Sequence, residues 1–194
     1  YYEQLLGGKR LDWIQCYAEG KYTFVQEGRA VWPEFNDNLM TADLEPDPSL
    51  PIHIGLDFGL TPAAVFAQRL KNGRWHVLHE LVTFEMGLER FCSSLKADLS
   101  SRFPGYSILV WGDPAGMQRD QIFETTSFDH LKTHGILAQP TATNDFKTRR
   151  EALAMPMGRL IDGKPGFLVD RKCIRVRKSL GGGYHFRRVS IGAG

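Results

Sequence analysis

Residues 52–62 decide the fold of this 194-residue chain, and they read Ile52-His53-Ile54-Gly55-Leu56-Asp57-Phe58-Gly59-Leu60-Thr61-Pro62. This short apolar run is interrupted by two glycines and ended by Pro62, a pattern typical of a buried strand that runs into a tight turn. One carboxylate, Asp57, lies within the run. Burying an ionised carboxylate is costly unless it is paired, hydrogen-bonded or bound to a cation. Asp57 is therefore the first residue whose role needs an explanation.

Three roles suit Asp57 when it is taken alone. Its side chain can cap the following turn, it can form a buried ion pair with an arginine, or it can serve a metal or catalytic site. A second copy of the pattern favours the third role, because residues 107–116 form another apolar run that ends in Gly112-Asp113-Pro114. Two strands that each end in an aspartate can lie side by side, and their carboxylates then repel each other unless a divalent cation lies between them.

The segments that follow Asp57 predict a mixed sheet. Residues 63–70 are apolar, residues 71–73 signal a tight turn, and residues 75–84 alternate as a partner strand, so Asp57 opens an antiparallel meander. A helix is expected over 87–102, the second aspartate strand over 107–112, a helix within 115–134 and a short strand over 136–139. This order predicts an α/β fold of the ribonuclease H-like type, whose first three strands are antiparallel and whose fourth strand lies parallel to the first. Function in such sheets lies at strand ends.

Charge is distributed unevenly along the chain. Residues 1–144 hold 12 basic against 18 acidic side chains, and residues 145–194 hold 12 against 4. A basic C-terminal quarter is a hint of nucleic-acid binding, although a solvated helix face explains it nearly as well. No run approaches the length of a membrane span, and we expect no signal peptide. The three cysteines, Cys16, Cys92 and Cys173, lack metal-ligand spacing, which favours buried thiols in a reducing compartment.

An ordered set of motifs resembles the nuclease domain of the large terminase subunit of tailed bacteriophages. The matching stretches are Gly55-Leu56-Asp57-Phe58-Gly59, Gly112-Asp113-Pro114-Ala115-Gly116, Asn144 with Arg149-Arg150-Glu151-Ala152-Leu153, residues 166–170 with Cys173, and Leu180-Gly181-Gly182-Gly183-Tyr184. Trp13, Gly20 and Trp32-Pro33-Glu34-Phe35 also resemble the segment that joins motor to nuclease in that family. Each motif is weak by itself, but together they span nearly the whole chain in the right order.

The resemblance implies a metal-dependent endonuclease that cuts concatemeric double-stranded DNA during viral DNA packaging. Asp57 and Asp113 would hold Mg²⁺ or Mn²⁺, with two ions expected for phosphodiester hydrolysis. The implied partners are double-stranded DNA, the portal protein, the small terminase subunit and an ATPase domain of the same polypeptide. The implied location is the host cell cytoplasm, without a membrane.

The family reading places DNA contacts in the basic C-terminal part. Lys147, Arg149 and Arg150 are expected to precede a helix of about three turns, and Arg175 and Lys178 to lie in a second basic helix. Such residues would contact phosphates without base readout. For any one of them, an ordinary exposed helix face is about as good an explanation.

The family also completes its acidic cluster with a carboxylate in a late helix. The sequence reaches Gly194 without such a stretch, so we expect weak metal binding and poor cutting by these 194 residues, with Asp129, Asp145, Asp170 and Glu85 as conceivable substitutes. We also expect a division into residues 1–50, a helix and linker that lead from a missing ATPase domain, and residues 51–194, a nuclease domain without its C-terminal end. No phosphate-binding Gly-x-x-x-x-Gly-Lys-Ser/Thr loop occurs in the chain.

Two other functions fit the same residues. Residues 57–61 also suit the phosphate-clasping turn of actin-like and sugar-kinase ATPases, although residues 181–183 are a poor match to the glycine-rich adenosine loop that these proteins need. Alternatively, the chain is a non-catalytic DNA-binding module in which Asp57 and Asp113 are merely structural. Nucleotide binding and the effect of replacing either aspartate separate these hypotheses from the nuclease.

Overall fold

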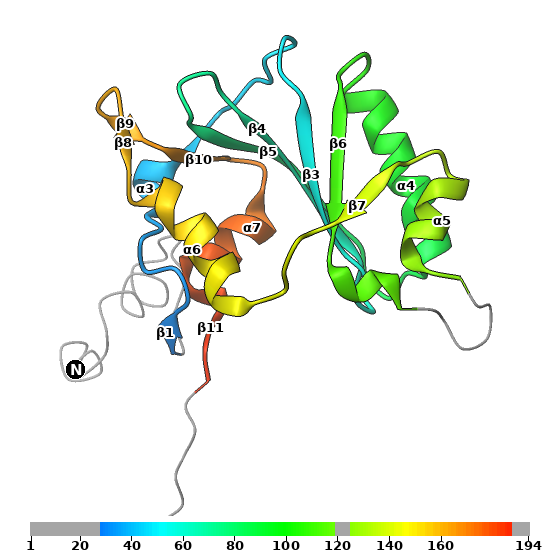
Figure 1. Cartoon of the computed structure of the whole chain (residues 1–194). Helices are drawn as coiled ribbons and strands as arrows, with labels where there is room; N and C mark the ends of the chain where they lie inside the picture. Colours follow the sequence, from blue (N-terminus) through cyan, green and yellow to red (C-terminus); the bar gives the residue numbers. More distant parts are fainter. Residues whose placement is uncertain (1–27, 119–124, 188–194) are drawn as a thin grey trace, which may run out of the picture.

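The computed structural model describes residues 28–118 and 125–187. Within them a mixed sheet has the strand order β2-β10-β5-β4-β3-β6-β7 (Figure 1). The strands are β1 (Arg29–Ala30), β2 (Thr41–Ala42), β3 (Ile52–Asp57), β4 (Ala63–Arg69), β5 (Trp75–Val82), β6 (Ile108–Gly112), β7 (Ala138–Pro140), β8 (Leu160–Ile161), β9 (Lys164–Pro165), β10 (Phe167–Asp170) and β11 (His185–Phe186). The helices are α3 (Asp37–Met40), α4 (Leu88–Arg102), the 3-10 helix η1 (Pro114–Met117), α5 (Ser127–Thr133), α6 (Phe146–Met157), α7 (Ile174–Lys178) and the π-helical turn η2 (Ser179–Gly183).

The predicted core topology is confirmed. Strands β3, β4 and β5 form an antiparallel meander, β6 lies parallel beside β3, and β7 lies parallel beside β6. Strands β10 and β2, which the sequence pattern did not indicate, extend the sheet beyond β5 in parallel pairing. In the pairing of β3 with β6, Leu56 lies opposite Gly112, so both predicted aspartates follow at the same edge of the sheet.

One face of the sheet is covered by α4 and α5 (Figure 1). Helix α4 forms where Leu88, Phe91, Leu95 and Leu99 recur at helical spacing, and this stripe faces the sheet. Phe91 and Leu95 are fully buried against strand residues such as Phe66. This core is built almost entirely of apolar side chains from residues 52–138, so one continuous stretch of chain supplies it.

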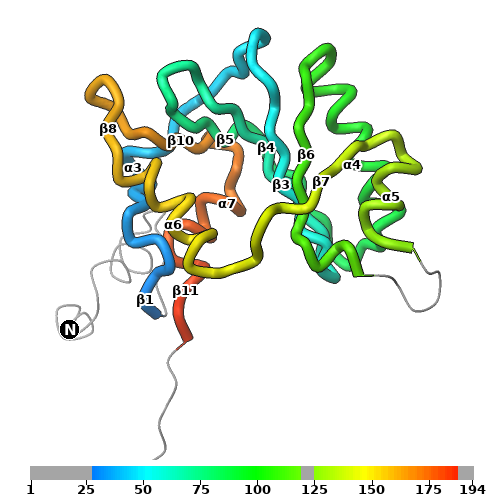
Figure 2. The backbone as a smooth tube through the Cα atoms, viewed as in Figure 1, coloured from blue at the N-terminus to red at the C-terminus, as the bar shows by residue number. Residues whose placement is uncertain are grey.

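The other face is covered by α3, α6, α7 and the segment around Trp32. The predicted anchoring turn at residues 32–35 is confirmed, because the Phe35 amide donates to the Trp32 carbonyl at 3.2 Å. The Trp32 ring stacks on Tyr184, with centroids 5.7 Å apart, and its indole N–H donates to the Arg150 carbonyl at 3.1 Å. Figure 2 shows residues 28–50, near the start of the chain, beside its last described elements.

The expectation of a linker over residues 36–51 is wrong. This stretch contains α3 and β2, and it is fastened to the sheet by Gln68, whose side-chain amide donates to the carbonyls of Asp47 and Leu50. Residues 28–50 therefore pack against the rest of the fold, while the division into two domains at residue 50 remains a prediction. The helix expected over residues 1–22 lies outside the described residues. Within the described part of the chain, no helix is long and apolar enough to cross a membrane.

Candidate active site

The two predicted aspartates lie at adjacent strand ends. Asp57 is the last residue of β3 and Asp113 directly follows β6. Phe58 holds these ends together, because its ring lies where a Cβ on Gly112 or Gly116 would come within 2.5 Å of it. Only glycine allows this close approach. The Phe58 ring also meets Phe128 of α5 edge to face, with centroids 5.3 Å apart, so the turn after Asp57 is fixed against β6 and η1.

Asp57 is exposed, which answers the question that its apolar surroundings raised. Its Oδ1 lies 3.4 Å from the Gly59 amide, a long and therefore weak turn contact. Among the described residues, no arginine forms an ion pair with it. The capping and ion-pair explanations thus account for little of this side chain, and its carboxylate faces solvent at the sheet edge.

Asp113 is half-buried and more tightly held. Its Oδ1 accepts hydrogen bonds from the Ala115 amide at 2.8 Å and from the Asn144 side-chain amide at 3.1 Å. The first of these caps η1, which begins at Pro114. Both bonds fall on one oxygen, so Oδ2 has no partner within residues 28–118 and 125–187. The carboxylate is oriented by the protein and presents a lone oxygen to a ligand.

Asn144 and Arg149 join the site from the third direction. Asn144 precedes α6, and its Oδ1 accepts a hydrogen bond from Nη1 of Arg149. Lys147, Arg149 and Arg150 were expected to precede a helix, but they lie within the first turns of α6. The sequence indicated Asn144 only through the family motif and gave no sign of its contact with Asp113. Nothing in a local pattern relates residues that are 31 positions apart.

The five predicted DNA contacts differ in their surroundings. Lys147, Arg175 and Lys178 are exposed on α6 and α7. The Arg150 guanidinium instead binds Glu34 at 2.7 Å, Glu151 at 2.5 Å and the Val31 carbonyl at 3.0 Å, and the contact with Glu34 raises the pKa of Arg150. Of the five, Arg150 is thus the most committed to the protein itself, and Arg149 is the one held near Asp113.

The conceivable substitutes for a third acidic ligand have other partners or surroundings. Asp129 caps α5 in a reciprocal box with Thr126, and Asp145 caps α6 through the Thr148 amide at 2.7 Å. Asp170 is buried and accepts hydrogen bonds from the amides of Leu44 and Lys172. In the described residues, no group of three His, Cys, Asp or Glu side chains is arranged to hold a metal ion.

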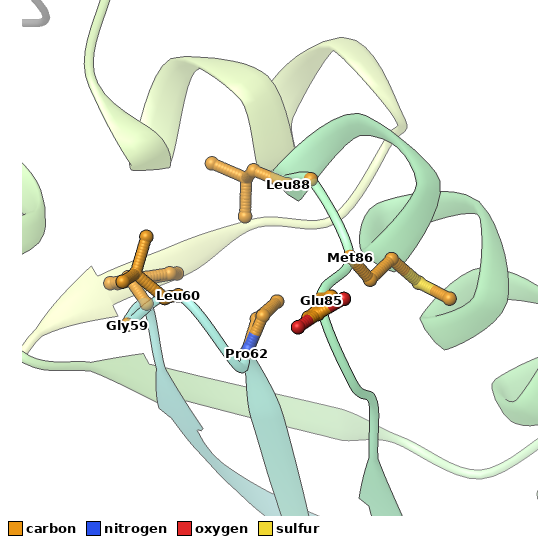
Figure 3. Close-up of a pocket in the computed structure, with 8 residues that line it drawn as sticks. Gly59, Leu60, Pro62, Glu85, Met86 and Leu88 are labelled. Carbon is orange, nitrogen blue, oxygen red and sulfur yellow. The ribbon is translucent and has the colours of Figure 1, made fainter.

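Glu85 lines a hollow of about 440 Å³ beside the turn that follows Asp57 (Figure 3). The remaining lining residues are Phe58, Gly59, Leu60, Pro62, Met86, Gly87 and Leu88. Figure 3 shows the Glu85 carboxylate close to Pro62. With one ionisable side chain among apolar neighbours, the hollow lacks a set of metal ligands.

Comparison with solved structures shows which fold this is. By sequence, no family model and no curated protein matches the chain. The nuclease domain of the phage P22 large terminase is similar over 78% of this chain and 76% of its own, with 13% identity and a TM-score of 0.58. The large terminase nuclease from the thermophilic phage G20c is similar over 84% and 86%, with 16% identity and a TM-score of 0.57.

A third similar structure is the large terminase of another thermophilic bacteriophage, which matches 97% of this chain with 14% identity and a TM-score of 0.61. The chain spans 46% of the length of that protein. At such low identities the likeness establishes the fold, and the chain has the mixed α/β, ribonuclease H-like fold of terminase nuclease domains.

Proposed function

We propose that the chain is the endonuclease domain of a large terminase and cuts concatemeric double-stranded DNA by metal-dependent phosphodiester hydrolysis. One observation carries the proposal, namely that Asp57 and Asp113 end adjacent parallel strands of a terminase-type nuclease fold. An exposed carboxylate beside an oriented one, at the edge of the sheet where function lies in such folds, supports a catalytic site.

The donor chemistry fits Mg²⁺ or Mn²⁺. Both ions prefer oxygen ligands, which the carboxylate of Asp57 and the Oδ2 atom of Asp113 offer. Two anionic side chains at neighbouring strand ends repel each other, and a divalent cation between them removes that repulsion. When bound, a pair of such ions supplies an activated water and stabilises the leaving oxygen of the phosphodiester. Asp57 and Asp113 would hold them, together with a further ligand outside the described residues.

The basic side chains would place the DNA. Arg149, next to Asp113, and Lys147 on the same helix would contact the phosphates that flank the scissile bond. Arg175 and Lys178 of α7 would extend this track, with Arg150 as its most protein-bound member. Contacts of this kind bind the backbone without reading bases, so binding should weaken steeply with salt.

The third similar structure suggests the wider setting. That large terminase has been solved with ADP and with ATP-γ-S, and this chain matches less than half of it. By analogy, we assign to this chain an ATPase domain in the same polypeptide, a portal protein and a small terminase subunit as partners, and a place in the host cytoplasm.

Nicking of supercoiled plasmid tests the proposal. The 194-residue chain is incubated with Mn²⁺, Mg²⁺ or EDTA, beside Asp57→Ala and Asp113→Ala, with the exposed Asp43→Ala as a matched control. We expect nicking with either metal, none with EDTA, and none by the two site variants. Nicking that survives either substitution contradicts the assignment of that carboxylate.

Nicking by neither the parent nor a longer polypeptide that includes the following residues would favour the non-catalytic DNA-binding module. Saturable ATP binding by the 194-residue chain would favour the actin-like or sugar-kinase ATPase instead.

A further inference from the structure

The loop between β7 and α6, residues 141–145, is built onto the strand that carries Asp113. At its start the Thr141 amide donates to the Gly112 carbonyl at 3.0 Å. At its end the Asp145 amide donates to the Thr143 hydroxyl at 3.0 Å, and the Asp145 carboxylate accepts the Thr148 amide. Both ends of the loop are therefore fixed, and the residue between them, Asn144, has a defined position beside Asp113.

The Asn144 side chain is oriented by its two neighbours. A guanidinium can only donate hydrogen bonds, so the amide oxygen of Asn144 must face Arg149. The amide nitrogen then faces Asp113, where it donates to Oδ1 at 3.1 Å. Because the Ala115 amide occupies the same oxygen, the pair of donors turns Oδ2 of Asp113 away from the protein.

We propose that Asn144 and Arg149 are positioning residues for Asp113, and that Arg149 acts on the metal site through Asn144. The inference rests on the proposed metal-dependent nuclease function. A guanidinium that polarises the Asn144 amide strengthens the hydrogen bond that the amide gives to Asp113. Groups that orient a ligand in this way typically change metal affinity by about 10- to 100-fold.

A purely structural role for the contact is a weaker explanation. Helix α6 is already anchored by the buried side chains of Ala154 and Met157 and by the ion pair between Arg150 and Glu34. Asn144 and Arg149 are both exposed, so their removal should leave the packing of α6 intact. Metal affinity and thermal stability should therefore respond differently to substitution.

Mn²⁺ binding in the absence of DNA measures the effect directly. Free Mn²⁺ is counted by electron paramagnetic resonance during titration of the 194-residue chain, Asn144→Ala and Arg149→Lys, and Tm is recorded for each. Asn72→Ala is the matched control, because Asn72 also donates to an exposed aspartate, Asp162, at 3.3 Å. Arg102→Lys controls for replacement of an exposed, aspartate-paired arginine.

We expect Asn144→Ala to raise the Kd for Mn²⁺ about tenfold with Tm unchanged. Arg149→Lys, which keeps the charge but loses the planar fork, should raise it less and in the same direction. Both controls should match the parent.

An unchanged Kd in both site variants, with a raised KM for plasmid, would overturn the inference and make these residues DNA contacts, while the nuclease function would stand. A fall in Tm parallel to the loss of Mn²⁺ affinity would also overturn it, in favour of a structural role. Absence of both Mn²⁺ binding and nicking in the parent would refute the proposed function, and the inference with it.

Discussion

The two faces of the sheet are held by different forces. Under α4 and α5, the core consists of fully buried apolar side chains such as Phe66, Phe91 and Leu95, supplied by one continuous stretch of chain. On the other face, segments more than 100 residues apart are joined by polar contacts. Arg177 binds both carboxylate oxygens of Asp37, and the Leu44 amide donates to Asp170. We call these the apolar face and the clasped face.

This difference explains how the candidate site is assembled. The strands of the apolar face supply Asp57 and Asp113, whereas Asn144 and Arg149 come with α6 of the clasped face. Apolar burial is non-directional and fixes the overall position of elements, while hydrogen bonds fix the direction of single side chains. The site therefore takes its ligands from one face and their orientation from the other.

The largest effect is expected from Phe66→Ala on the apolar face. The side chain is fully buried, so its removal should lower the free energy of unfolding by about 3–5 kcal/mol. Urea unfolding followed by circular dichroism measures the change. Phe84→Ala is the control, because Phe84 is 80% exposed and its loss should stay within about 0.5 kcal/mol. Equal losses at the two positions would contradict the assignment of the core.

Gly112→Ala should break the junction between the faces at the site. The added Cβ would come within 2.5 Å of the Phe58 ring, so the turn after Asp57 must shift or the strands must separate. We expect a loss of about 1–3 kcal/mol in stability and a loss of nicking at temperatures where the variant is folded. Gly55→Ala is the control, since a Cβ there meets nothing within 4 Å. Full nicking by Gly112→Ala would show that Phe58 does not align the two aspartates.

Arg177→Met should weaken the clasped face by about 2 kcal/mol at neutral pH, because it removes charge-assisted hydrogen bonds to a partly buried carboxylate. Hydrogen bonding to Arg177 holds the pKa of Asp37 below its ordinary value. A lowered carboxyl pKa stabilises the fold above the ordinary value of about 3.9 and ceases to do so as the pH falls through the lowered pKa.

The difference in stability between parent and Arg177→Met should accordingly be complete above about pH 5 and shrink as the pH falls below about 4. Urea unfolding between about pH 3 and 7 measures it across this range. Arg102→Met, which removes an exposed pair with Asp98, should cost no more than about 0.5 kcal/mol at any pH. A difference that does not vary with pH would exclude the Asp37 pair as its source.

The smallest effect concerns the two described cysteines, which report on one face each. Burial raises the pKa of Cys92 on the apolar face to about 11 and that of Cys173 on the clasped face to about 12. Neither thiol should react with a disulfide reagent at about pH 8 in the native state. In mild urea, single-thiol variants in a Cys16→Ser background should show Cys173 reacting first, because polar contacts hold its face. Faster labelling of Cys92 would reverse the proposed order of stability.

Much of the apolar face could be predicted because its signals are local. The strand over 52–57, the antiparallel meander and the helix over 87–102 follow from spacing and turn residues within short windows, and the structure confirms them. Strands β10 and β2 escaped prediction, since four- and two-residue strands carry no period of their own. The pairing of β2 with β10 joins positions more than 100 residues apart.

The sequence alone determined that two carboxylates end neighbouring strands, because alternation, glycine and proline set strands and turns within a few residues. Only the tertiary structure decided what surrounds them. Arg149 and Arg150 are adjacent and chemically identical, yet one contacts the residue that holds Asp113 and the other binds Glu34. Successive helical residues point about 100° apart, and which direction meets the site depends on how α6 packs against distant segments.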